Sequence, residues 1–164
     1  MKATKKLYGP EGHAEALKAL ERFSIVMSKT SGNRLLVSAK APSSSLIGQL
    51  LKGGTNIELS FILKVPQSCN LLIKHKAGDV NVNAIRGNIS INNHAGDVAL
   101  ELSGKEKYVV DAKCRLGEVT SDFKREEQAV SDRVSQAADR NKPYQVYLRV
   151  DVGEIRVVKT TRSD

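Results

Sequence analysis

Apolar and polar positions alternate through most of the second half of the chain, in short runs that each follow a glycine. The same triplet opens each run: glycine, then Asp, Asn or Glu, then Val or Ile. A period of two residues indicates a strand with one buried face, and glycine permits the positive φ of a tight corner. One corner-and-strand unit is therefore predicted to be used repeatedly. Its five copies begin at Gly78, Gly87, Gly96, Gly117 and Gly153.

The spacing of these glycines predicts how the units are arranged. The first three are 9 residues apart, and two such units form a coil of about 18 to 21 residues, as in a β-solenoid. We expect each corner Val or Ile to point inward and to stack on its counterpart about 4.8 Å away. Residues 155–158 are expected to close the last coil, with Lys159 and Arg162 protecting an exposed final edge from further pairing.

The part of the chain before the repeats predicts a more mixed structure. Residues 13–23 place apolar side chains at helical spacing, and residues 46–51 fit either a short capped helix or a loop. Gly32-Asn33 between two apolar runs is typical of a β-hairpin. From residue 57 the alternation indicates a strand up to the break at Pro66.

These patterns predict an all-β chain that forms one domain over residues 1–164. Its main part is a parallel β-solenoid of the short repeats, and one or two short helices lie in the N-terminal third. The polar insertion has a thin helical stripe and fits a helix or a solvated loop. The expected boundaries are a capping region at 1–56, the solenoid at 57–158, the insertion at 124–143 and a tail at 159–164.

Composition changes this interpretation little. Aromatic residues make up 4% of the chain and Trp is absent, which favours a thin aliphatic core over a ring-lined pocket. The formal net charge is +8, but residues 1–56 carry nine basic and three acidic side chains while the rest is nearly balanced. A basic N-terminal surface for a polyanion is one hypothesis, and ordinary solubilising charge is the simpler one. The candidate contacts are Lys2, Lys5, Lys6, Lys18 and Arg22.

Catalytic and metal-binding patterns are sparse. Stacked corners would align their second residues into a ladder that either holds a cation or bonds nearby backbone amides, and the second is favoured. These residues are Asp79, Asn88, Asp97, Glu118 and Glu154. No phosphate loop, nucleophile elbow or zinc-protease motif occurs in the sequence, so we expect no cofactor and no enzyme activity. The carboxylate pairs Glu101 with Asp111 and Asp122 with Glu126 are of a kind that any chain rich in acids offers.

Histidines and cysteines add no site. His75 and His94 differ by one position relative to the following glycine, so they should face opposite ways and not form a metal pair. Cys69 and Cys114 lie in alternating apolar runs, which fits free packed thiols or a disulfide between neighbouring coils.

No run of about 18 apolar residues is present, so the sequence predicts no membrane span. The basic start at Lys2 is followed by Gly9-Pro10 where a signal peptide would be apolar. The chain is therefore expected either to be cytoplasmic or to begin after a removed export signal.

The segment 73–102, with its three spaced Gly-Asp/Asn-Val/Ile triplets, and the distant Gly117-Glu118-Val119 resemble a bacterial adhesin-type family, a domain of unknown function. The likeness covers roughly residues 57–158. The resemblance implies a parallel β-solenoid of exported or envelope-attached proteins, with no catalytic residues to carry over.

The expected function is therefore a non-catalytic, envelope-associated module for adhesion, scaffolding or partner binding. Its expected partner is a protein or a cell-envelope polymer, and a nucleic acid is disfavoured because aromatics are few in the basic third. Two alternatives remain: a cytoplasmic scaffold that self-assembles by stacking solenoid ends, and a protein that binds polyanions through its basic N-terminal third.

Overall fold

The computed structural model divides into two compact units, residues 1–64 and 65–164. Every element among the described residues is a strand, so the predicted all-β class is confirmed there. The helices predicted at 13–23 and 46–51, and most of the 124–143 insertion, lie outside the described residues. No helix occurs among the residues that the structure describes, so the prediction of one or two short helices is not confirmed. The structure describes residues 2–8, 24–30, 34–40, 56–123 and 142–160, with the backbone alone at 2–8, 39–40 and 56–59.

The described residues of the first unit form two antiparallel strand pairs. Its strands are β1 (Lys2–Tyr8), β2 (Ser24–Thr30), β3 (Arg34–Lys40) and β4 (Asn56–Ile62). The pairing of β2 with β3, in which Thr30 lies opposite Arg34, confirms the predicted hairpin. β4 pairs antiparallel with β1. The alternating run from residue 57 therefore belongs with the N-terminal strand, and the parallel repeats begin only after Pro66.

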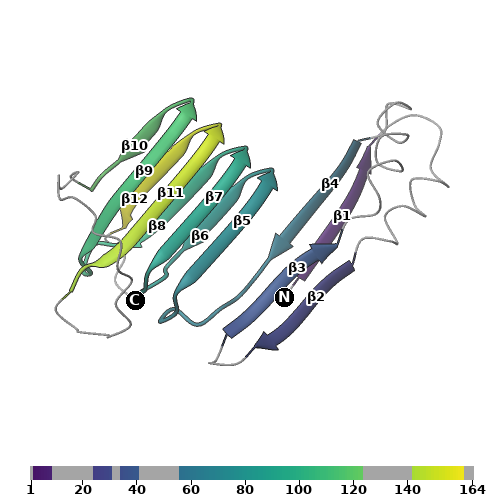
Figure 1. Ribbon diagram of the computed structural model, residues 1–164, viewed down its shortest axis with the longest axis horizontal. Helices are drawn as coiled ribbons and strands as arrows, with labels where there is room; N and C mark the ends of the chain where they lie inside the picture. Colours follow the sequence, from purple (N-terminus) through teal and green to yellow (C-terminus); the bar gives the residue numbers. More distant parts are fainter. Residues whose placement is uncertain (1, 9–23, 31–33, 41–55, 124–141, 161–164) are drawn as a thin grey trace. The chain divides into compact units, whose positions relative to one another are not determined.

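In the second unit, the residues that the structure describes form two four-stranded parallel sheets (Figure 1). The first sheet has the strand order β5-β7-β11-β9 and the second sheet β6-β8-β12-β10. Each strand of the first sheet leads through a short turn into a strand of the second. The parallel arrangement is thus confirmed, although the described strands form two open sheets and no closed coil. The strands are β5 (Leu71–Ala77), β6 (Val80–Asn83), β7 (Ile89–Ala95), β8 (Val98–Ser103), β9 (Tyr108–Leu116), β10 (Val119–Ser121), β11 (Tyr144–Val152) and β12 (Ile155–Thr160).

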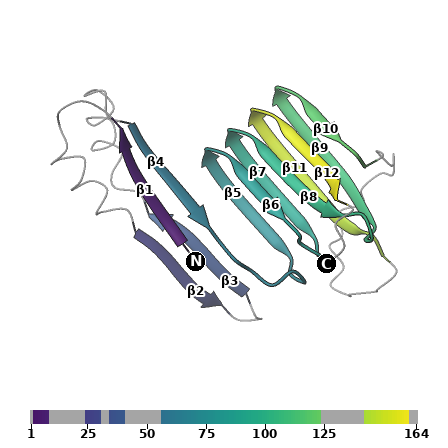
Figure 2. The same ribbon diagram turned by 180° about the vertical axis from the view of Figure 1, so that it is seen from behind.

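The order of strands in space departs from their order in the chain. The C-terminal pair β11 and β12 lies between β7–β8 and β9–β10, as the yellow strands between the teal and green ones show from both sides (Figures 1 and 2). The prediction that residues 155–158 form an exposed final edge is therefore wrong. The inserted position gives these apolar strands neighbours on both sides, which buries Leu148 and Ile155 to 1% exposure or less.

The core lies between the two sheets and is deepest at their central strands. Alternate side chains point inward, and a strand with neighbours on both sides loses more exposed surface than an edge strand. All of the largest fully buried side chains belong to β7, β8, β11 and β12. They are Ile89, Ile91, Asn93, Val98, Leu100, Leu102, Val146, Leu148, Ile155 and Val157.

Three aromatic rings gather where β9 and β11 begin. The Tyr108 ring packs edge-on against Phe123, with ring centroids 5.7 Å apart, and lies 5.6 Å from the ring of Tyr144. The Tyr108 hydroxyl donates a 3.0 Å hydrogen bond to the carbonyl of Ile85, a buried residue between β6 and β7. Burial, assisted by the charge of Glu106, raises the pKa of Tyr108 to about 12. This cluster ties the edge strand β9 to the connection between β6 and β7.

Replacing Tyr108 by Phe should destabilise the unit by about 1 kcal/mol near neutral pH, because the carbonyl of Ile85 loses its donor. The difference from wild type should shrink between pH 10 and 12. In that range the unfolded tyrosine, with its ordinary pKa of 10.0, releases a proton that the folded one retains, so stability falls as the pH rises. Denaturant unfolding at several pH values measures this, and the exposed Tyr147→Phe serves as control. A difference that is constant across the range would contradict the prediction.

Candidate functional site

Four of the five repeat glycines form one column of turns. Gly78, Gly96, Gly153 and Gly117 precede β6, β8, β12 and β10, and all four have φ between 112° and 140°. Their backbones pack so closely that a Cβ on three of them would collide with the neighbouring glycine carbonyl. Gly87 lies at a different turn, before β7, without positive φ. There a Cβ would collide with the carbonyl of Cys69.

Three of the residues that follow the glycines accept a backbone hydrogen bond from the next layer. The backbone N–H of Asp97 donates to Asp79 Oδ1 (3.0 Å), and that of Glu154 donates to Asp97 Oδ1 (2.9 Å). At the other turn, Asn88 accepts a bond from the N–H of Gln145 (2.9 Å). These bonds satisfy backbone donors at corners where the strand ladder is interrupted. Within the described part of the chain, no group of three or more His, Cys, Asp or Glu side chains is placed to hold a metal ion.

A polar residue that the sequence reasoning missed lies beneath the glycine column. Asn93 is fully buried, and its Nδ2 donates to the carbonyls of Gly78 (3.0 Å) and Gly96 (2.9 Å). Cys114 donates in the same way from Sγ to the carbonyl of Gly153 (3.0 Å). The available signal was parity, since Asn93 follows Ile89 and Ile91 at alternate positions and so had to point inward.

The two cysteines are free and partly buried. Burial raises the pKa of the Cys69 thiol. Of the two alternatives that the sequence left open, free packed thiols are therefore observed.

The two histidines face opposite ways, as their register predicted. His75 pairs with the inward Asn93. His94 is exposed, and its Nδ1 lies 2.5 Å from Oδ2 of Asp151 on β11.

The outward side chains of the first sheet form the most chemically varied surface among the described residues, and we name it the basic face. It carries five Lys or Arg side chains, two Asp, one His and one Tyr. The lysines at its two edges are exposed, whereas Arg149 and both aspartates are half-buried. The face consists of Leu72, Lys74 and Lys76 on β5, Ser90, Asn92 and His94 on β7, Tyr147, Arg149 and Asp151 on β11, and Asp111, Lys113 and Arg115 on β9.

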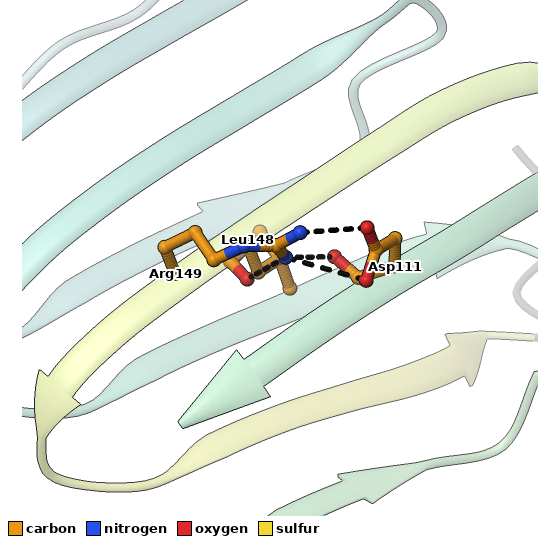
Figure 3. Close-up of polar contacts among 3 residues, drawn as sticks. All are labelled: Asp111, Leu148 and Arg149. Atoms are coloured by element: carbon orange, nitrogen blue, oxygen red, sulfur yellow. Dashed lines mark hydrogen bonds and ion pairs between the residues drawn. The ribbon is translucent and has the colours of Figure 1, made fainter. Parts of the chain in front are cut away.

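An ion pair between β9 and β11 organises the middle of this face (Figure 3). Nη2 of Arg149 lies 2.7 Å from Asp111 Oδ2, and Nη1 donates to Asp111 Oδ1 (3.3 Å), to the Asp111 carbonyl (3.1 Å) and to the Leu148 carbonyl (2.7 Å). The guanidinium also lies over the Tyr147 ring, 3.6 Å from its centroid. Five contacts thus fix Arg149, and Arg149 fixes the ring of Tyr147.

The outward face of the second sheet is different in character. Its described side chains are mostly short or uncharged, with Arg156 and Glu101 as opposite charges on β12 and β8. Glu101 and Asp111, one of the carboxylate pairs noted in the sequence, therefore lie on different sheets. In the other pair, Asp122 accepts the N–H of Lys159 (3.0 Å), and Glu126 is outside the described residues.

The candidate polyanion contacts are only partly described. Lys2, Lys5 and Lys6 lie on β1, opposite Ile62, Leu59 and Glu58 of β4. Lys18 and Arg22 are outside the described residues.

Comparison of the sequence with models of protein families identifies the family of this chain. The model described as Toastrack DUF4097 matches residues 19–158, most of the chain. The chain belongs to the Toastrack family. The function of Toastrack domains is unknown, so the expected β-repeat family of unknown function is confirmed at that level. No curated protein and no solved structure matches the chain. Within the described Toastrack residues, no helix has the length and apolarity needed to span a membrane.

Proposed function

We propose that this chain is a non-catalytic binding module of the β-solenoid type, acting in adhesion, scaffolding or partner binding at the cell envelope. The main observation in support of this proposal is the basic face. Ionic, amide, hydroxyl and aromatic groups are gathered there on one face of one sheet, while the outward face of the second sheet offers mainly short or uncharged groups.

Rigidity supports a binding role for this face. Its central strands β7 and β11 are paired on both sides, and the inward side chains in the middle of β11 and at the first three inward positions of β7 are buried. A surface that is already ordered loses little conformational entropy when a ligand binds. The Asp111–Arg149–Tyr147 contacts extend that order to the side chains of the face.

The test is sedimentation of the purified chain with isolated bacterial envelopes. Reversing two edge charges, Lys74→Glu with Lys113→Glu, should weaken binding by roughly tenfold or more, since each favourable charge becomes repulsive. The matched control, Lys105→Glu with Arg156→Glu, makes the same change in net charge away from the basic face and should bind as wild type does. Envelope binding that is absent, or that both double variants reduce equally, would overturn the proposal.

A further inference from the structure

The ring of Tyr147 has the properties of a stacking platform. It is 44% exposed although Arg149 lies against it. The guanidinium is itself held by Asp111 and by the Leu148 carbonyl. An aromatic side chain whose position is fixed in advance offers contact area at low entropic cost. A flat apolar group on a ligand would find this ring already in place.

Hydrogen-bonding groups surround the ring. Ser90 lies opposite Tyr147 on β7, and Asn92 lies opposite Arg149. Gln145, two residues before Tyr147 on the same strand, is exposed. These hydroxyl and amide groups both donate and accept. One ring with amides and hydroxyls beside it suits a ligand that has an apolar ring face and a rim of hydroxyls, which is the chemistry of a sugar.

Cations lie on both sides of this central region. Lys74 and Lys76 are exposed on β5, and Lys113 and Arg115 are exposed on β9. The two strands are three strand spacings apart, about 14 Å at roughly 4.8 Å each. The two acidic side chains of the face are engaged, Asp111 by Arg149 and Asp151 by His94. The face therefore presents positive charge at its edges to a ligand lying across the strands.

We propose, on the basis of the proposed function, that the basic face binds an acidic polysaccharide that runs across the strands. A sugar ring stacks on Tyr147, and acidic groups of neighbouring sugars pair with Lys74 and Lys113. A membrane surface fits less well, because Leu72 and Tyr147 are the only large apolar side chains that the face exposes. Single-stranded nucleic acid fits less well because its bases need several stacking rings.

The test is calorimetric titration of the full chain with three defined acidic polysaccharides: polygalacturonate, alginate and hyaluronate. At least one should bind in a salt-dependent way. For polygalacturonate, the fully methyl-esterified form keeps the sugar backbone and removes the charge, and it serves as the neutral control. Tyr147→Leu should weaken binding about tenfold by removing the stacked ring, whereas Tyr147→Phe should bind as wild type does. Melting curves of both variants verify that the fold is retained.

Three outcomes would overturn the inference. One is the absence of binding to all three polysaccharides. Another is polysaccharide binding that Tyr147→Leu leaves unchanged, together with binding of inorganic polyphosphate at the same affinity. The face would then attract any polyanion and would not recognise a sugar ring. The third is binding only to vesicles that contain anionic lipid. If the envelope test succeeds and this one fails, the binding module stands and only its ligand class is wrong.

Discussion

Val98→Asp should unfold the second unit. Val98 is 1% exposed and lies between Val80 and Ile155 on the neighbouring strands, so a carboxylate there would be surrounded by aliphatic side chains. An unpaired charge cannot be kept in such a site, and we expect a loss of roughly 4 kcal/mol or more. That is a large part of the stability of a domain of this size.

Circular dichroism melting measures the effect, with Asp97→Asn as the adjacent control. Asparagine keeps the Oδ1 atom that accepts the N–H of Glu154, so this control should melt close to wild type. The two variants compare an inward position with the outward position next to it in the sequence. An unchanged melting curve for Val98→Asp would mean that the buried face of β8 has been misassigned.

The inward face was predictable because it is a local property. Alternation alone placed Val98 inside, and the same alternation placed His75 and His94 on opposite sides. Asn93 could have been found by the same rule, since its position relative to Ile91 is fixed by the pleat. Hydrogen bonding by the corner side chains likewise follows from residue type and turn position.

The order of strands was not predictable in this way. The 21 residues from Gly96 to Gly117 looked like successive coils, yet Gly96 packs against Gly153, which is 57 residues away. Which strand pairs with β8 depends on the match of whole apolar surfaces, and glycine spacing carries no information about that. The ion pair between Asp111 and Arg149 could not be predicted from the sequence for the same reason, because the two residues meet only when β11 inserts beside β9.

That insertion makes the corner at Gly153 a tightly constrained glycine position. Its φ is 140°, and a Cβ would lie 2.7 Å from the carbonyl carbon of Gly96 and closer still to its oxygen. Both obstacles are backbone, which cannot turn aside as a side chain can. Gly153→Ala should therefore cost on the order of 2 to 5 kcal/mol, from backbone strain and overpacking together.

Gly104→Ala is the matched control for this substitution. Gly104 has no positive φ, and its nearest obstacle would be the flexible end of the Lys159 side chain, 2.9 Å away. Chemical denaturation should show a small change in stability for Gly104→Ala and a large one for Gly153→Ala.

Because Gly153 connects β11 to β12, its substitution should also weaken any ligand binding that depends on Tyr147 and Arg149. Equal, small effects at the two glycines would show that the corner can widen, and that the inserted pair of strands is not locked into the stack by close packing of the glycine column.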